Sequence, residues 1–202
     1  QDMDKMGNLF PKMKLTAIMM WIGTLAIVGF PYSSGYFSKD LILSSSFNLD
    51  SLGSLVYIIL AIVSAMTAFY SFRLIFKVFH GPYNGDYDYN KIHESGIYMI
   101  TPLVLLSVGA IFAGYFFNNI LSGYNAKEFW NEIIFLSKEK HHYSSFFPIF
   151  SKTLITIGIA LAVYFYGFNQ AKLNDLKKQF VNIYQFILNK WYFDELYDKI
   201  FV

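Results

Sequence analysis

Long apolar stretches alternate with short polar segments along the chain. No charged residue occurs between Leu15 and Ser38, and at a rise of ~1.5 Å per residue this run is long enough to cross a hydrocarbon core of ~30 Å. After Lys39 and Asp40 the chain becomes apolar again. We therefore predict one membrane-spanning segment over residues 13–47, with both charges inside it.

Two residues of this segment predict a break in its helix. Pro31 has no backbone N–H and disfavours helical geometry at the preceding residue. Gly35 adds flexibility, and nearby serines can hydrogen-bond the backbone groups that a break exposes. Irregular backbone at membrane depth persists only where protein or water covers it, and transporters bind ions at such discontinuous helices. We expect two half-helices that meet within the membrane near Pro31.

Three further segments predict membrane spans, at residues 51–79, 96–121 and about 147–168. Each is rich in Ile, Leu, Val, Phe and Tyr. The pattern as a whole predicts an all-α integral membrane fold with four transmembrane helices, the first of them discontinuous.

Positive charge is divided unequally between the two ends of these spans. One end holds Lys5, Lys12, Lys14, Lys77, Lys91, Lys172, Lys177, Lys178, Lys190 and Lys199, with Arg73 just inside it. The other end holds Lys127, Lys138, Lys140 and Lys152. The richer end is predicted to be cytoplasmic, so the chain starts in the cytoplasm, crosses four times and returns there.

The residues after the last span have a different pattern. Between Lys172 and Trp191, apolar residues recur at steps of three and four with polar residues between them. This spacing predicts an amphipathic helix on the membrane surface, and an amphipathic segment packed on neighbouring loops explains it equally well. The chain thus divides into a cytoplasmic loop (1–14), a transmembrane part (15–168) and an amphipathic segment (169–202).

Composition supports a membrane protein and excludes several other classes. Hydrophobic residues make up 55% and charged residues 15% of the sequence, and the mean hydropathy is +0.38, which is too apolar for an ordinary soluble domain. Because there is no cysteine, disulfides and thiolate-bound iron–sulfur clusters are excluded, and the sequence has no dinucleotide-binding fingerprint. A net charge of +2 with scattered basic residues gives no support for nucleic-acid binding.

Lys39 is the main candidate for chemistry. Ionisable residues within a membrane mark ion or proton pathways, because their burial is costly. The alternative, in which Lys39 extends to a lipid headgroup, is disfavoured by the apolar sequence on both sides. Asp40 lies about 100° further round a helix, so the two need not form one ion pair.

Other polar residues have simpler explanations. Arg73 and Lys77 fit interfacial anchoring at the end of the second span, and Glu94 fits charge compensation at a helix N-terminus before the third span. His141 and His142 lack an obvious third ligand, so we expect no metal site. A Ser38–Lys39 nucleophile is disfavoured because neighbours on a helix point apart.

Six motifs, in order and covering nearly the whole chain, resemble one family. They are QDMDKMGNL at Gln1, GFPYSSGYFSKDLIL at Gly29, FRLIFKVFHG at Phe72, HESG at His93, PLVLLSVGAIFAGY at Pro102 and NKWYFDELYDKIFV at Asn189. They resemble the chain-L subunit of respiratory complex I, the antiporter-like family whose mitochondrial members are NADH dehydrogenase subunit 5.

The resemblance implies roles for individual residues. Lys39 matches the lysine of a central hydrophilic axis in the family, Asp40 matches the acid beside it, and the helix that carries them is discontinuous. The family commonly has a second proline where this chain has Tyr32. The resemblance also implies that the chain is a C-terminal fragment, running from the loop before the twelfth helix of the family to the start of the lateral helix.

The function that the resemblance implies is proton translocation by a membrane subunit of NADH:quinone oxidoreductase. NADH, FMN, iron–sulfur clusters and quinone would be bound by partner subunits, and this chain would bind no cofactor. Its partners would be the other membrane subunits, especially the neighbouring antiporter-like subunit, and the lipid bilayer. The expected location is the bacterial inner membrane, with the mitochondrial inner membrane as the alternative.

Two other functions stay open at this point. One is the large subunit of a multisubunit cation/proton antiporter, which resembles this family in its discontinuous helix and buried lysine. The other is a split or truncated fragment that does not pump protons.

Overall fold

The computed structural model describes residues 2–47, 52–130, 133 and 146–201. These residues are predominantly helical and include no strand, which confirms the predicted all-α class. The α-helices are α1 (Lys14–Val28), α2 (Ser34–Phe47), α3 (Gly53–Ile75), α4 (Ile97–Leu121), α5 (Ala126–Trp130), α6 (Phe146–Ala162), α7 (Gln170–Gln179), α8 (Val181–Leu188) and α9 (Phe193–Phe201). Two π-helical turns, η2 (Phe76–His80) and η4 (Val163–Phe168), extend α3 and α6, and short 3₁₀ turns form η1 (Met3–Lys5), η3 (Tyr89–Lys91) and η5 (Lys190–Tyr192).

Three helices are long and apolar enough to cross a membrane. They cover Gly53–His80, Ile97–Leu121 and Phe147–Phe168, with mean hydropathies of 2.1, 2.0 and 1.7. Their ends agree within a few residues with the three continuous spans predicted from the sequence. The segment predicted over 13–47 is instead made of α1 and α2, which have 15 and 14 residues. Each half-helix is too short to cross a bilayer by itself.

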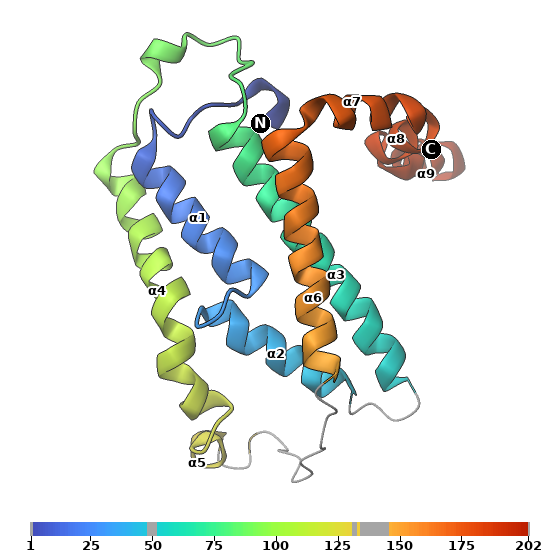
Figure 1. Ribbon diagram of the computed structural model, residues 1–202. Helices are drawn as coiled ribbons and strands as arrows, with labels where there is room; N and C mark the ends of the chain where they lie inside the picture. Colours follow the sequence, from blue (N-terminus) through green and yellow to red (C-terminus); the bar gives the residue numbers. More distant parts are fainter. Residues whose placement is uncertain (1, 48–51, 131–132, 134–145, 202) are drawn as a thin grey trace.

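The helices form a bundle in which α3 and α6 lie side by side and α4 runs along α1 (Figure 1). After the break, α2 turns away from the line of α1 and packs against α3 and α4. Helices α3 and α6 approach each other closely, since a Cβ atom on Gly158 would lie 2.4 Å from the Ala65 carbonyl oxygen. We call this contact the α3–α6 seam, formed by Ala61, Ala65, Ala68, Gly158 and Ala162. Small residues let helix backbones approach closely in a membrane.

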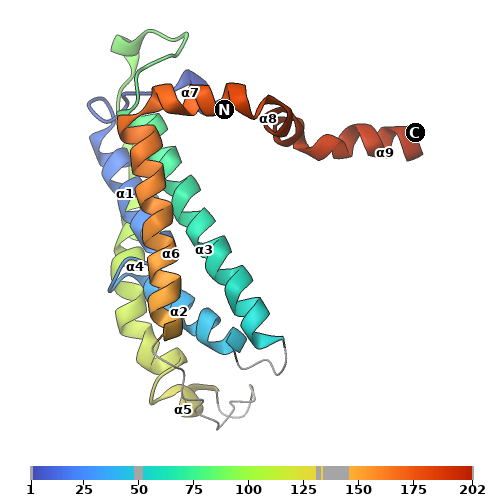
Figure 2. The same ribbon diagram turned by 45° about the vertical axis from the view of Figure 1, so that its right-hand side comes forward.

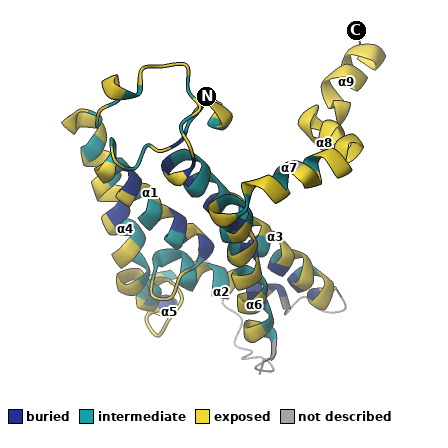
Figure 3. Ribbon diagram, turned by 45° about the horizontal axis from the view of Figure 1, so that its top comes forward, coloured by how far each residue is buried: buried dark blue, intermediate teal, exposed yellow. Residues whose placement is uncertain are grey.

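Helix α4 is the most open of the long helices. Figure 3 shows α4 coloured mainly as exposed and intermediate. Ser107 is its one buried residue, and large apolar side chains such as Leu105, Leu106 and Phe116 are exposed. An apolar helix with so little protein contact needs an apolar surrounding. Lipid or a neighbouring protein surface meets this need, in agreement with a membrane-embedded chain.

The C-terminal segment departs from the prediction of one amphipathic helix. It forms three short helices, α7 to α9, which run across the end of the bundle and away from it (Figure 2). Phe180 has a non-helical backbone conformation and separates α7 from α8. Lys190, Trp191 and Tyr192 all have positive φ and separate α8 from α9. The rings of Trp191 and Tyr192 pack on Phe186. The apolar spacing indicates which side chains share a helix face, but it contains no information on these backbone angles.

Tyr32 allows a test of the turn between α1 and α2. Its φ is +68° and its side chain is 81% exposed. We expect Tyr32→Gly to raise the free energy of unfolding by about 0.5–1 kcal/mol, because relief of the left-handed strain (~1–2 kcal/mol) exceeds the entropy that glycine adds to the unfolded chain. Thermal unfolding of the full-length protein in detergent measures this change.

Two further variants make this test specific. Tyr124 is 98% exposed and is not among the residues with positive φ, so Tyr124→Gly should lower stability slightly. Proline cannot adopt φ near +68°, so Tyr32→Pro should lower stability strongly. A Tyr32→Pro protein as stable as the wild type would contradict the left-handed turn.

Candidate functional site

The end of α1 creates the centre of the candidate site. Gly29 has φ +88° and donates its N–H to the Ala26 carbonyl at 3.1 Å, and the Phe30 N–H donates to the Leu25 carbonyl at 2.9 Å. This is a Schellman motif, which needs a left-handed residue such as glycine at its turn. The motif satisfies two of the last carbonyls of α1 and leaves the Val28 carbonyl for another donor.

Lys39 supplies that donor from α2. Its Nζ lies 3.4 Å from the Val28 carbonyl oxygen, and its side chain is half-buried. A Cβ atom on Gly29 would lie 3.3 Å from Cδ of Lys39, so glycine here also leaves room for the lysine stem. The C-terminus of a helix carries partial negative charge, which attracts an ammonium group. The break therefore brings a titratable group against an open backbone carbonyl within the predicted span.

Gly35 fixes how closely the two half-helices meet. A Cβ atom at this position would lie 1.8 Å from the Ala26 carbonyl oxygen. The first turn of α2 therefore rests directly on the backbone of the last turn of α1. Both residues predicted to shape the break lie in the observed interruption or beside it, since Pro31 falls between Val28 and Ser34.

Asp40 forms its ion pair with Lys152 and not with its neighbour Lys39. Its Oδ2 lies 3.6 Å from Nζ of Lys152, on α6. Lys152 also donates to the Tyr36 hydroxyl at 3.3 Å and lies 5.0 Å from the centre of the Tyr36 ring. Two lysines therefore make contacts at α2. Lys39 belongs to α2 and reaches the end of α1, whereas Lys152 belongs to α6 and reaches Asp40 and Tyr36 of α2.

A cavity of about 320 Å³ is lined in part by Tyr36 and Asp40, the two residues that Lys152 contacts. Its lining comes from α2, α3, α4 and α6 and includes the polar side chains of Asp40, Ser44, Asn118 and Ser151. Most of the lining is apolar, so these four side chains form a polar patch within it. Lys39, Asp40 and Lys152 therefore place titratable groups between the helix break and this cavity.

Lys152 is a functional candidate that the sequence reasoning missed. It was counted as a charge of the outer end, although it lies within the span predicted at 147–168. The argument that singled out Lys39, an ionisable residue inside an apolar segment, applies to Lys152 as well. Its contact with Asp40 was beyond that argument, because the two residues are brought together only by the packing of α6 near α2.

Glu94 holds the other end of α1. Its carboxylate accepts from the N–H of Leu15 at 2.9 Å, from the N–H of Thr16 at 3.3 Å and from the Thr16 hydroxyl. The expectation of charge compensation at a helix N-terminus is met by α1, not by α4, which follows Glu94 in the sequence. Burial raises the pKa of this carboxyl, but the Thr16 hydroxyl and the N–H groups of Leu15, Thr16 and Ser95 outweigh it and hold the pKa below its usual value.

This cap predicts a pH-dependent effect on stability. Glu94→Ala should lower the free energy of unfolding by about 1 kcal/mol near neutral pH, as for other N-terminal caps. Because the pKa is lowered in the folded state, the stabilisation is present above the unfolded pKa and is lost as the pH falls through the folded one. Thermal unfolding of wild type and variant at neutral and acidic pH should show a difference that shrinks on acidification. A pH-independent difference would contradict the role of the charged carboxylate.

Metal binding finds no support in the described part of the chain. No group of three or more His, Asp or Glu side chains gathers there. His141 and His142, the pair weighed in the sequence, lie outside the described residues.

Comparison with known proteins assigns the family. Residues 70–202 match the family described as NADH dehydrogenase subunit 5 C-terminus. The chain belongs to the NADH dehydrogenase subunit 5 family. Residues 1–69 match a second family description, NADH:quinone oxidoreductase/Mrp antiporter, TM. The resemblance predicted from the six motifs is thus confirmed.

Relatives of the NADH dehydrogenase subunit 5 family align along the whole chain. NADH-ubiquinone oxidoreductase chain 5 of Chondrus crispus is 37% identical over 217 residues, which cover 100% of this chain and 32% of the relative. The proteins of the same name from Schizophyllum commune and Phytophthora infestans are 32% and 36% identical, covering 100% and 98% of this chain and 31% of each relative. The chain therefore spans about a third of the length of these curated relatives.

Proposed function

We propose that this chain is part of a proton-translocating membrane subunit of NADH:quinone oxidoreductase. The observation that carries the proposal is the Lys39 ammonium, which meets the Val28 carbonyl where the helix of the predicted first span is interrupted. Discontinuous helices place helix ends at ion sites of transporters. Family membership supports the assignment to complex I.

In this proposal α1 and α2 together form the first of four spans, followed by α3, α4 and α6. Lys39 exchanges a proton, and Asp40 and Lys152 extend the path toward the cavity that Asp40 lines. Protonation favours the contact of Lys39 with the Val28 carbonyl, and loss of the proton weakens it. A change in the local field therefore shifts both the proton and the contact.

The oxidation of NADH is carried out elsewhere in the assembly. The proposal places NADH, FMN, iron–sulfur clusters and quinone in partner subunits, with this chain as a translocase component of the enzyme. Its neighbours are the other membrane subunits, foremost the adjacent antiporter-like subunit. Its location is the energy-transducing membrane that contains complex I.

A second function is favoured by one observation. The family description matched by residues 1–69, which include α1, α2 and Lys39, names the Mrp antiporter together with NADH:quinone oxidoreductase. A subunit of a cation/proton antiporter would use the same broken helix. The match of residues 70–202 to NADH dehydrogenase subunit 5 favours the complex I assignment.

Native electrophoresis of solubilised membranes separates the two functions. Bands are stained for NADH oxidation and analysed by mass spectrometry for peptides of this chain. We expect these peptides in a large band that oxidises NADH. Peptides found only in a band without this activity would overturn the assignment and favour the antiporter.

A further inference from the structure

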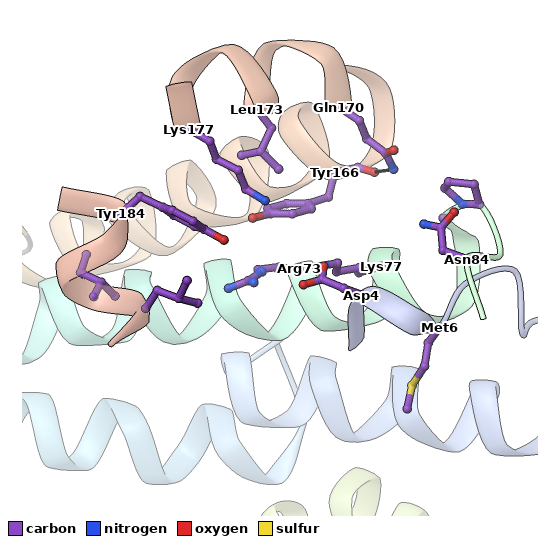
Figure 4. Close-up of a pocket in the computed structure, with 14 residues that line it drawn as sticks. Asp4, Met6, Arg73, Lys77, Asn84, Tyr166, Gln170, Leu173, Lys177 and Tyr184 are labelled. Carbon is purple, nitrogen blue, oxygen red and sulfur yellow. Dashed lines mark hydrogen bonds and ion pairs between the residues drawn. The ribbon is translucent and has the colours of Figure 1, made fainter. Parts of the chain in front are cut away.

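A cavity of about 690 Å³ lies at the opposite end of the bundle from the Asp40–Lys152 pair. It is enclosed by the end of α3, the turn after η2, the N-terminal residues and the helices α7 and α8 (Figure 4). This is the end to which the sequence assigns most of the positive charge. The cavity shares no residue with the candidate proton path.

Three cationic side chains line this cavity. Arg73, Lys77 and Lys177 line it, with Asp4 as its one acidic residue. Asp4 is paired with Lys77, so it leaves the other two cations without a carboxylate in the lining. Figure 4 shows Arg73 and Lys177 reaching into the same space from α3 and α7. The site thus has an excess of positive charge that no lining side chain balances.

Arg73 has a donor that the described side chains leave unsatisfied. Its Nε atom is buried and has no hydrogen-bond partner among the described residues. The guanidinium lies over the Tyr166 ring, with Cζ 5.7 Å from the ring centre, and this contact fixes the plane of the donors. Buried donors without a partner are rare, because each costs free energy. A phosphate group fits such a planar fork of donors.

The rest of the lining combines the polar Asn84 and Gln170 with an apolar part. Leu173, Ile187 and Leu188 come from α7 and α8, and the Tyr184 ring lies 5.3 Å from Nζ of Lys177. The cavity also lies at the end of the span Gly53–His80, where headgroups begin. A free anion would gain nothing from the apolar walls, whereas a lipid can place acyl chains against them. Basic pockets between membrane helices at this end bind anionic headgroups.

We propose that this cavity binds the phosphate of an anionic membrane phospholipid, with Arg73 and Lys177 as its principal ligands. The lipid would join α3 to the tail that begins at α7, because one cation comes from each. It would thereby fix the direction in which α7 and α8 leave the bundle. This role is separate from proton transfer and does not depend on the proposed function.

The test uses the complete assembly with Arg73→Gln, Lys177→Gln or the control Lys199→Gln, which lies on α9 outside the cavity. Each is placed in nanodiscs of phosphatidylcholine with increasing phosphatidylglycerol, and retained lipid is counted by native mass spectrometry. We expect affinity for phosphatidylglycerol to fall at least about tenfold in both cavity variants, as for loss of a hydrogen bond to a charged group. The control should match the wild type.

The result for Lys177→Gln decides the matter even if Arg73→Gln fails to assemble, because Lys177 is on a surface helix. Retention equal to wild type in Lys177→Gln would overturn the proposal. A second arm titrates inorganic phosphate in pure phosphatidylcholine and follows the thermal midpoint. If phosphate stabilises the wild type but not Lys177→Gln, while lipid retention is unchanged, the site takes free phosphate and the lipid proposal is wrong.

Discussion

Lys39→Ala is expected to lower the proton-to-electron ratio of the assembled complex while assembly is retained. The substitution removes the titratable group that meets the Val28 carbonyl at the helix break. Removing a proton-transfer group typically slows its step by on the order of 100-fold or more. The ratio is measured in sealed membrane vesicles from the rate of acidification and the rate of NADH oxidation.

Lys39→Arg separates proton transfer from a structural role. Arginine keeps the positive charge beside the Val28 carbonyl, but it does not release its proton. A merely structural lysine would therefore be replaced well by arginine, and a proton relay would not. We expect Lys39→Arg to assemble at wild-type levels and to show the lowered ratio. An unchanged ratio in both variants would refute the proposed role, and Lys199→Ala, on the exposed α9, serves as the control.

Gly35→Ala is expected to destabilise the chain by roughly 3 kcal/mol, at the upper end of the cost of overpacking. The added methyl would lie 1.8 Å from the Ala26 carbonyl oxygen, and backbone cannot move aside as a flexible side chain can. The two half-helices must separate, which withdraws Lys39 from the Val28 carbonyl. Thermal unfolding and the yield of assembled complex both measure the loss.

Gly23→Ala is the matched control for this substitution. Gly23 lies within α1, and a Cβ atom there would meet nothing within 4 Å. Because alanine is favoured over glycine in a helix by about 1 kcal/mol, Gly23→Ala should be neutral or stabilising. Equal losses from both substitutions would show that the close approach at Gly35 is not the cause.

The sequence predicted a helix break near Pro31, where the structure has it, but not the backbone conformation of the break. Pro31 indicated an interruption, yet α1 already ends at Val28 because Gly29 adopts a left-handed conformation. Tyr32 completes the turn with a second left-handed residue. Steric rules for proline are local and can be read from the sequence. The choice of φ at Gly29 and Tyr32 depends on how α2 packs against α1.

The candidate site was predicted only in part, because most of its contacts also depend on how the helices pack. Lys39 was identified because a charged residue inside an apolar run can be recognised from the sequence alone. Its acceptor on Val28 and the pairing of Asp40 with Lys152 depend on tertiary packing. The same holds for Glu94, whose helix N-terminus belongs to a distant segment. Partners that come from separate helices have no signature in the spacing of a single sequence.

The α3–α6 seam has a mechanical consequence. Where Gly158 meets the Ala65 backbone, neither helix can slide or rotate without driving a side chain into its neighbour. Helices α3 and α6 therefore form a rigid pair within the bundle. Residues 29–33, which lie outside both half-helices, are free of this constraint. Under the proposed function we therefore expect movement in residues 29–33 and in the Lys39 side chain, because Gly35 also holds α2 against the Ala26 backbone.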